Sequence, residues 1–213
     1  APGTWSKARG TARHPYNEPI NPELDNASFH PDYTTVADGS LRIRWDRTPN
    51  TYYDRIYEYT TGIATTAPGF AFKYGFVEAR VKVPNGPGLW RALWLLPLPV
   101  NTWPPEIDIA EWIGQEDGTV NVKFNLHWRS LGQHRQIQDW PTYATDVGGD
   151  WHIYGMHWEK DRITVYFDGS VVYEYEGPGI PREEMYLVIS GGVVRGAYPE
   201  PGEMLIDYVR VWQ

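Results

Sequence analysis

Three carboxylates lie close together in the sequence, at Glu106, Asp108 and Glu111. They alternate with apolar residues in a run that otherwise has the pattern of a β-strand. Carboxylates in such a run cost free energy unless they are paired or used. Two carboxyl groups on either side of a glycosidic bond can cleave it, one as nucleophile and the other as general acid and base. We therefore predict that these three residues are catalytic and that the chemistry is glycoside hydrolysis.

The spacing of the three acids requires an irregular strand. On a regular strand the side chains at 106, 108 and 110 share one face, and Glu111 points to the other. A one-residue bulge near 109–110 would return Glu111 to the face of Glu106 and Asp108, and bulges are common next to active sites. Four strand steps of roughly 3.3 Å, with the side chains leaning together, then bring the outer carboxyls within roughly 5–6 Å, the separation of a retaining mechanism. We expect Glu106 to be the nucleophile, Glu111 the acid and base, and Asp108 the residue that tunes their pKa values.

Aromatic residues flank the acids on both sides. Trp103 and Trp112 bracket the run, and Trp90 and Trp94 precede it at hairpin distance. An acid-rich strand can simply face solvent. Rings beside paired carboxylates are instead typical of a sugar-binding cleft, which favours the catalytic interpretation.

The elements that must position these residues are β-strands. Alternating or apolar runs bounded by turn residues predict strands at 41–45, 75–83, 121–128, 162–167, 170–175, 185–190 and 204–212. Asp168-Gly169 between two of these runs predicts a tight hairpin. No stretch has a helical period over three turns, so we expect few and short helices. The pattern indicates an all-β sandwich.

The length of 213 residues fits one catalytic domain over 1–213. Residues 1–35 are rich in Pro, Asn and Thr and have little periodicity. We expect them to form a loop-rich segment packed on the sandwich rather than a second domain.

Composition narrows the choice of partners. The net charge is −8 without a long basic cluster, which argues against nucleic acid, and no apolar run has the length of a membrane span. The 11 Trp and 15 Tyr fit an aromatic carbohydrate-binding surface. The chain begins at Ala1 without an initiator Met or an apolar leader, as a secreted mature protein would. We expect a secreted monomer with a polysaccharide as its partner.

The acid run resembles the signature of glycoside hydrolase family 16. That signature has the order Glu, an aliphatic residue, Asp, an aliphatic residue, an optional extra residue and a second Glu. The extra residue, here Ala110, is typical of the laminarinase-like branch. The resemblance covers roughly residues 40–213 and includes the segments 72–80, 88–94, 150–155 and 207–212. It implies a β-jelly-roll of two curved antiparallel sheets, of the concanavalin A-like lectin and glucanase type, and retaining endo-hydrolysis of β-linked glucans or galactans.

The resemblance also implies roles for single residues. Glu106, Asp108 and Glu111 match the family's nucleophile, assisting acid and acid/base, and no cofactor is expected for catalysis. His127 matches a histidine near the acid/base. Each flanking residue has a structural alternative: a core tryptophan, a surface ion pair or a packed histidine. The candidates for substrate binding are Trp90, Trp94, Arg80, Trp103, Trp112, His127, Arg91 and Asn21.

Two further positions carry expectations about ligands. Arg91 stands where Pro is common in the laminarinase-like branch. Arg91 and Arg195 are candidates to face an acidic substituent of the substrate, such as sulfate, uronate or succinyl, because guanidinium groups match such anions well. Family members bind a structural calcium ion on the convex face through an Asp that matches Asp207, so Asp207 is a candidate metal ligand.

Several activities remain open at this stage. β-1,3-Glucan is the leading substrate, and β-1,3-1,4-glucan, a galactan or an acidic exopolysaccharide are alternatives. Transglycosylation shares the first half-reaction. A non-catalytic carbohydrate-binding protein is a further alternative on the same scaffold, but such a protein has no use for the acid triad. The histidines form no recognised metal-ligand spacing with a nearby acid, which argues against metal-dependent catalysis.

Overall fold

The computed structural model describes residues 4–7, 19–52, 54–67, 69–137 and 141–213. Within these ranges the regular structure is almost entirely β, and a single 3-10 turn, η1 (Pro31–Tyr33), is the only helix. The prediction of an all-β fold with few and short helices is confirmed. No helix in these ranges is both long and apolar enough to cross a membrane.

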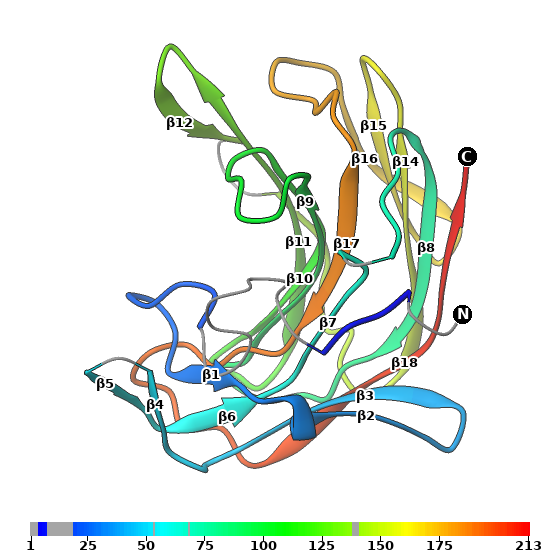
Figure 1. Ribbon diagram of the computed structural model, residues 1–213. Coiled ribbons are helices and arrows are strands. Elements are labelled where there is room, and N and C mark those ends of the chain that lie inside the picture. Colours follow the sequence, from blue (N-terminus) through cyan, green and yellow to red (C-terminus); the bar gives the residue numbers. More distant parts are fainter. Residues whose placement is uncertain (1–3, 8–18, 53, 68, 138–140) are drawn as a thin grey trace.

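Two curved sheets stack against each other (Figure 1). In the described part of the chain the outer sheet has nine strands, in the order β1 (Ala27–Phe29), β6 (Tyr59–Thr61), β3 (Ser40–Asp46), β18 (Gly202–Trp212), β8 (Gly75–Lys82), β14 (Trp151–Trp158), β15 (Ile163–Phe167) and β16 (Ser170–Tyr175), with β2 (Thr34–Ala37) beside β3. The inner sheet has seven, in the order β12 (Gln133–Gln136), β11 (Val120–Ser130), β10 (Glu106–Gly114), β9 (Trp90–Pro97), β17 (Met185–Ser190) and β7 (Ile63–Thr65), with β13 (Thr142–Ala144) beside β11. A separate ribbon pairs β4 (Asn50–Tyr52) with β5 (Arg55–Tyr57).

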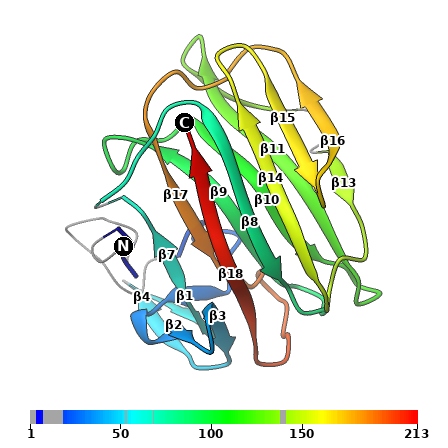
Figure 2. The ribbon, with the colours of Figure 1, turned by 90° about the vertical axis from the view of Figure 1, so that its right-hand side faces the viewer.

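The main core lies between the two sheets. On β8 the buried side chains of Val77, Ala79 and Val81 alternate with partly exposed ones, as expected for a strand with one face on the core. β18 and β14 flank β8, so this strand lies in the middle of the outer sheet (Figure 2). Full burial of each valine side chain contributes roughly 1.5–3 kcal/mol. The alternation on β8 therefore fixes which face of the outer sheet meets the inner sheet.

The inner sheet is covered on part of its other face as well. A second hydrophobic cluster contains Phe29, Ile63, Trp94, Leu96 and Tyr186 and lies on the side of β9 and β17 that faces away from the main core. This explains why β9 and β17 are buried along nearly their whole length. The remaining part of this face carries a cavity that is lined by residues of β9, β10, β11 and β12 and of the segment 20–24.

The strands expected from the sequence are present with boundaries that agree within one or two residues. The two strands of the predicted hairpin, β15 and β16, are joined by Asp168 at φ 48° and Gly169 at φ 80°. Positive φ at both positions is what a type I′ turn requires, so the hairpin prediction is confirmed.

The N-terminal region contains more regular structure than the sequence suggested. Residues 1–3 and 8–18 of the expected loop-rich segment lie outside the described residues. Within 19–35, however, β1 pairs in parallel with β6, η1 follows, and β2 begins. Because β1 has only three residues, its pairing partner rather than its own periodicity decides its conformation, and the sequence pattern could not show it.

Candidate active site

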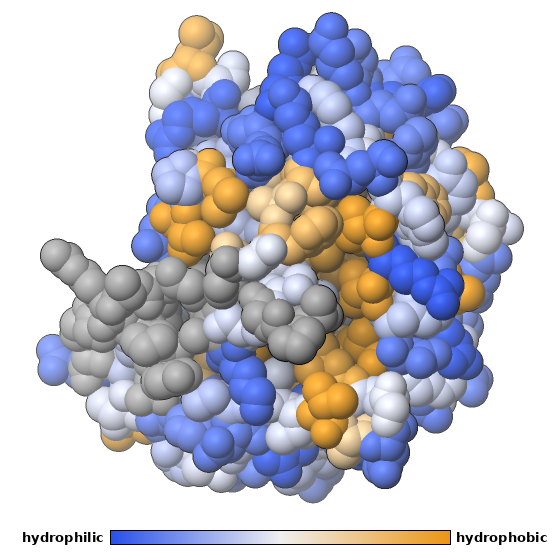
Figure 3. Space-filling model, turned by 45° about the vertical axis from the view of Figure 1, so that its right-hand side comes forward, coloured by the Kyte–Doolittle hydropathy of each residue, from blue (hydrophilic) through white to orange (hydrophobic). Residues whose placement is uncertain are grey.

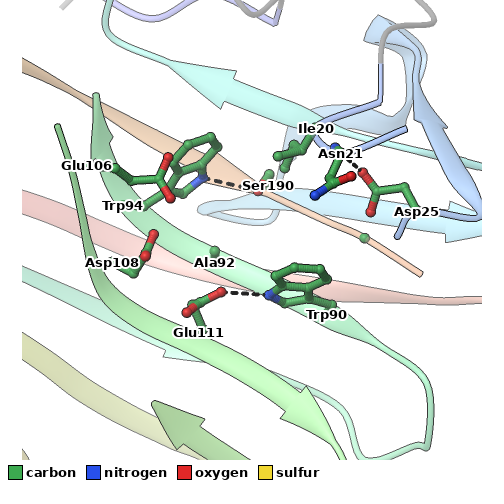
Figure 4. Close-up of a pocket in the computed structure, with 11 residues that line it drawn as sticks. Ile20, Asn21, Asp25, Trp90, Ala92, Trp94, Glu106, Asp108, Glu111 and Ser190 are labelled. Atoms are coloured by element: carbon green, nitrogen blue, oxygen red, sulfur yellow. Dashed lines mark hydrogen bonds between the residues drawn. The ribbon is translucent and has the colours of Figure 1, made fainter. Parts of the chain in front are cut away.

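The predicted bulge is present in β10. Its pairing with β9 shifts register between Asp108 and Ala110, and its pairing with β11 shifts between Asp108 and Glu111. Ile109 and Ala110 consequently both face the main core. Glu111 then returns to the side of Glu106 and Asp108, and all three carboxyl groups point to the same side of the strand (Figure 4).

A tyrosine holds the bulge in place. The hydroxyl of Tyr143, on β13, donates a hydrogen bond to the carbonyl oxygen of Ile109 at 3.0 Å. A bulge leaves one residue without its regular ladder partners, and this hydroxyl satisfies one of the freed groups. Burial raises the pKa of Tyr143 well above its usual value, so the hydroxyl stays protonated as a donor.

Two indole groups orient the two glutamates. Trp90 Nε1 donates to Glu111 Oε1 at 2.8 Å, and Trp103 Nε1 donates to Glu106 Oε2 at 2.9 Å. A third indole, of Trp94, donates to Ser190 Oγ at 3.2 Å in the same region. Hydrogen bonds from N–H groups to a carboxylate favour its charged form and fix its orientation. The structure thus brings Trp90 and Trp103 into contact with the acids and places Trp94 in the lining of the same cleft, while their role in substrate binding stays a prediction.

Two histidines complete this side of the site. His127 Nε2 lies 3.5 Å from Glu106 Oε1 and 3.3 Å from Asp108 Oδ2. Its other ring nitrogen, Nδ1, lies 3.0 Å from Nε2 of His134 on β12, and the two rings stack with centroids 5.2 Å apart. The ring of Trp103 lies 4.8 Å from that of His134. His127 thus lies beside the nucleophile predicted from the sequence.

Burial governs the protonation of the acids. It raises the pKa of Glu106 well above its usual value, and the charge of Asp108 raises it further, whereas His127 lowers it. Burial likewise raises the pKa of Asp108 well above its usual value, and the charge of Glu111 adds to this. Carboxyl groups with such shifts, lying in a cleft, are typical of acid–base catalysis.

The acids lie on the floor of a cleft whose larger cavity has a volume of about 510 Å³. The walls come from strands far apart in sequence and from an N-terminal loop, as Figure 4 shows for Ile20, Asn21 and Asp25. The described residues that line the two cavities of this cleft are Ile20, Asn21, Pro22, Leu24, Asp25, Trp90, Ala92, Trp94, Trp103, Glu106, Asp108, Glu111, Asn125, His127, His134, Gln136, Ser190 and Gly192. Asn21, a predicted binding residue, is among them.

The N-terminal wall is fixed by Arg195. Its guanidinium donates to the backbone carbonyls of Glu23 (2.9 Å), Pro22 (2.8 Å) and Asp25 (3.0 Å). Within the wall, Asp25 Oδ2 accepts from the backbone N–H of Asn21 at 2.7 Å. Arg195 is not among the described residues that line the cleft, and its Nε and one terminal nitrogen are engaged by these carbonyls, so the structure gives no support to the expectation that it faces an acidic substituent.

Two residues predicted to bind substrate lie instead in the core. Arg91 is 0 % exposed and donates to the carbonyl of Pro84, and its guanidinium lies 5.7 Å from the ring of Trp45. Burial lowers its pKa to about 9. Trp112 is also 0 % exposed and packs edge-on against Tyr154. The reason is strand alternation: Arg91 follows Trp90 and Trp112 follows Glu111, so both point away from the cleft.

Arg80 and Asp207 lie on the outer sheet and not in the cleft. Since Val77, Ala79 and Val81 face the core, Arg80 must face outward, and its guanidinium lies over the ring of Trp151 at 4.7 Å. It also donates to Asp207 Oδ2 at 2.8 Å. The prediction that Arg80 holds sugar near the cleaved bond is therefore wrong.

The surroundings of Asp207 do not fit a calcium site. Its carboxylate pairs with a guanidinium, and the adjoining cavity of about 360 Å³ is lined by Lys7, by apolar residues such as Trp5 and Leu41 and by several hydroxyl-bearing residues, with no second carboxylate among the described residues that line it. Calcium takes six to eight oxygen ligands, several of them carboxylates. We therefore assign no metal to Asp207.

On the face of the molecule drawn in Figure 3, hydrophobic residues gather in a strip through the middle.

Sequence reasoning missed several residues of the cleft. Asn125 and His134 lie on β11 and β12, and Ser190 ends β17. Asn125 stands two positions before His127 and therefore shares its face, a signal that strand periodicity contained. Nothing in the sequence shows that β12 folds back along β11 and brings His134 to the site.

Comparison with known proteins points in one direction. The model of Glycosyl hydrolases family 16 matches residues 25–210. The chain is 31% identical over 220 residues to Endo-1,3-1,4-beta-glycanase ExsH of Rhizobium meliloti (strain 1021). The aligned region covers 98% of this chain and 46% of that protein. It is 31% identical over 229 residues to Glucan endo-1,3-beta-glucosidase A1 of Niallia circulans, covering 91% of this chain and 32% of that protein. The chain thus spans less than half the length of these curated relatives.

A solved structure agrees with this. The laminarinase catalytic domain from Thermotoga maritima MSB8 superposes with a TM-score of 0.77 at 27% sequence identity, over 100% of this chain and 92% of that domain.

Proposed function

Because the chain belongs to glycosyl hydrolase family 16, we propose that it is a retaining endo-glycoside hydrolase that cleaves internal β-1,3-linkages of a polysaccharide glucan. The observation that carries this proposal is the bulge of β10, which puts Glu106, Asp108 and Glu111 on one face at the floor of a tryptophan-lined cleft. A protein that only binds carbohydrate gains nothing from burying three acids there, since their burial is unfavourable.

The first step forms a covalent intermediate. A carboxylate oxygen of Glu106 attacks the anomeric carbon while Glu111 donates its proton to the departing glycosidic oxygen. The bond between carbon and oxygen breaks, the half of the chain with the new hydroxyl leaves, and an ester to Glu106 remains. Trp103 holds Glu106 and Trp90 holds Glu111 in the orientations that this step requires.

The second step restores the enzyme. Glu111, now ionised, accepts a proton from water, and the hydroxide oxygen attacks the anomeric carbon and displaces Glu106. Two inversions at one carbon give net retention of configuration. The charge of Asp108 raises the pKa of Glu106, and a carboxylate with a higher pKa is a poorer leaving group. We therefore expect Asp108 to be protonated, and so uncharged, when Glu106 departs from the sugar.

The cleft favours an uncharged polymer. Among the described residues that line its two cavities there is no Lys or Arg, and the charged groups are carboxylates. This disfavours the acidic exopolysaccharide that we considered from Arg91 and Arg195. The name of the Niallia circulans relative, Glucan endo-1,3-beta-glucosidase A1, supports β-1,3-glucan. The name of the Rhizobium meliloti relative, Endo-1,3-1,4-beta-glycanase ExsH, makes β-1,3-1,4-glucan the second candidate.

The test is reducing-sugar release from laminarin, mixed-linkage glucan, agarose, carrageenan and an acidic exopolysaccharide by the wild type and by Glu106→Gln. We expect the wild type to cleave laminarin and the variant to cleave nothing. NMR of the first products should show the β-anomer, and longer oligosaccharides among the products would instead reveal transglycosylation. Binding of laminarin without cleavage by either protein would overturn the proposal in favour of a carbohydrate-binding protein.

We further propose that the enzyme works outside the cell as a monomer, because a long polysaccharide does not cross a membrane and the cleft is complete within one chain. Sedimentation equilibrium tests the monomer, and comparison of culture medium with washed cells of the producing organism tests the location. A stable dimer, or protein confined to the cells, would contradict the respective part.

A further inference from the structure

We propose that His127, Glu106 and Asp108 form a binding site for a Zn²⁺-like transition-metal cation, and that the metal blocks the nucleophile when it binds. One ligand atom from each of the three residues lies within 4.8 Å of the others, and this is the only such group of three among the described residues. The metal would be an inhibitor, with no part in the reaction.

The distances match the coordination geometry of zinc. Zn²⁺ binds imidazole nitrogen and carboxylate oxygen at about 2.0–2.2 Å, so two ligands of a tetrahedral site lie roughly 3.3–3.5 Å apart. His127 Nε2 is 3.5 Å from Glu106 Oε1 and 3.3 Å from Asp108 Oδ2. These two distances match the spacing of adjacent corners of a zinc tetrahedron, and all three ligand atoms lie within 4.8 Å of one another.

Asp108 supplies the second line of support. The residue is 3 % exposed, and its Oδ2 atom is buried without a hydrogen-bond partner. A buried carboxylate oxygen without a donor is unfavourable. This atom points at the same place as His127 Nε2 and Glu106 Oε1, so a cation there would satisfy it.

His134 prepares His127 for the metal. Ligating histidines usually engage their second ring nitrogen in a hydrogen bond, which fixes the ring and the tautomer. His127 Nδ1 lies 3.0 Å from His134 Nε2. With the proton on Nδ1, His127 donates to His134 and turns the lone pair of Nε2 toward the two carboxylates. A dication between the nitrogen and the acids relieves the resulting repulsion between electron pairs.

The site is open to an ion from solution. Side chains of Glu106 and His127 are 16% and 14% exposed, and both line the cavity of about 510 Å³. A metal bound to Glu106 Oε1 takes up the electron pair that would attack the anomeric carbon. Occupancy should therefore abolish hydrolysis, and a chelator should restore it.

The test is isothermal titration calorimetry, in which ZnCl₂ is titrated into the tag-free protein at pH 7. The wild type is expected to bind one Zn²⁺, with affinity reduced at least 10-fold in His127→Asn and in Glu106→Gln. His152→Asn is the matched control, because His152 faces a single carboxylate, Asp168, on the outer sheet at 2.8 Å. Its affinity should equal that of the wild type.

A second measurement reports the ligand itself. Electron paramagnetic resonance of bound Cu²⁺ should show coupling to imidazole nitrogen that disappears in His127→Asn and persists in His152→Asn. If His127→Asn does not fold, as judged by thermal unfolding without metal, the Glu106→Gln titration decides. No binding by the wild type up to millimolar Zn²⁺, or equal binding by all variants, would overturn the inference.

The binding half of this inference is independent of the proposed function, whereas the inhibition rests on it. A chain that binds Zn²⁺ as described but cleaves no polysaccharide would overturn the proposed function alone. A chain that cleaves laminarin and binds no Zn²⁺ would overturn the inference alone.

Discussion

At the scale of single residues, the site depends on how Glu106 and Asp108 share a buried environment. Both carboxyl groups have pKa values raised by burial, and the charge of Asp108 raises that of Glu106 further. Glu106 must nevertheless be ionised to attack. His127 and the indole of Trp103 lower its pKa and so partly offset the burial. The protonation of Glu106 is thus set by neighbours that can be changed one at a time.

Replacement of Asp108 by Asn should move the pH profile of hydrolysis. Asn has the same shape without the charge that raises the pKa of Glu106, so Glu106 ionises at lower pH. The acid limb of kcat/KM against pH should shift to lower pH, because this limb reports ionisation of the free enzyme's nucleophile. An acid limb that stays in place, or moves to higher pH, would show that Asp108 does not act on Glu106 through its charge.

The residues that sequence reasoning placed correctly are those whose chemistry is local to one strand. The three carboxylates and the bulge followed from the spacing along β10. Arg80, Arg91 and Trp112 were misplaced for a common reason, because residue type alone does not reveal which face of a strand meets the core. Alternation from Trp90 would have placed Arg91 inward. His134 required knowledge of a strand pairing that the sequence does not show.

At the scale of elements, the bulge is the feature on which catalysis depends, and Tyr143 is its support. The hydroxyl of Tyr143 reaches the Ile109 carbonyl from β13. We expect Tyr143→Phe to destabilise the fold by about 1–3 kcal/mol, because it leaves a buried carbonyl without its partner, and to lower kcat roughly 10-fold, because the two glutamates lose alignment. Thermal unfolding and laminarin hydrolysis measure the two effects.

Tyr175→Phe is the control for this prediction. Its hydroxyl also donates to a backbone carbonyl, that of Pro178, but at an exposed position on the outer sheet. An equal loss of kcat in both variants, or none in Tyr143→Phe, would contradict a role for the tyrosine in holding the bulge.

The loop of residues 20–26 is the second element that shapes the cleft. Arg195 holds it through three backbone carbonyls. Arg195→Ala should loosen this wall and raise KM for laminarin roughly 3–10-fold, since about 1 kcal/mol corresponds to a factor near 5, with a smaller effect on kcat because the acids are untouched. Arg182→Ala, at an exposed ion pair with Asp161, is the control and should behave as the wild type. A change in kcat alone would argue that Arg195 acts on the acids instead.

Most long strands could be predicted from the sequence, although β9 and β14 were not among the predicted runs, and the three-residue strands could not. Runs such as 75–83 and 204–212 carry enough alternation to identify a strand. β1, β6 and β7 have three residues each and are buried at every position. Such strands have no periodicity to read, and their pairing partners decide their conformation. Parts of the cleft wall likewise come from segments without readable alternation, the loop at 20–25 and the four-residue strand β12, and these parts could not be predicted.

At the scale of the whole molecule, the buried acids oppose stability at neutral pH. A carboxyl whose pKa is raised in the folded state binds its proton more tightly there than in the unfolded chain. The stability it contributes is fully present below the unfolded value near 4.5 and is lost as pH rises through the higher folded value. The native protein should therefore lose stability as the pH rises above the unfolded pKa values of 4.5 for Glu106 and 3.8 for Asp108.

Glu106→Gln should be more stable than the wild type at pH 7, by about 0.5–2 kcal/mol, the range typical when an unfavourable active-site group is removed. The difference should shrink toward zero at pH 4, where Glu106 is protonated in both states. Urea unfolding at a series of pH values measures it, with the exposed Glu176 replaced by Gln as the control. A stability difference that does not depend on pH would show that burial of the charge is not its cause.

The hydrogen bonds of Arg195 to the N-terminal loop also bear on the order of folding. Arg195 and Pro22 are 173 positions apart, so the contact closes a loop that contains most of the chain, and contacts of such long range form late. During synthesis on the ribosome β10 emerges with its carboxylates long before residue 195 is made. The three acids are therefore synthesised well before the loop that walls the cleft can be held by Arg195. Polysaccharide binding should appear as one of the last events of folding.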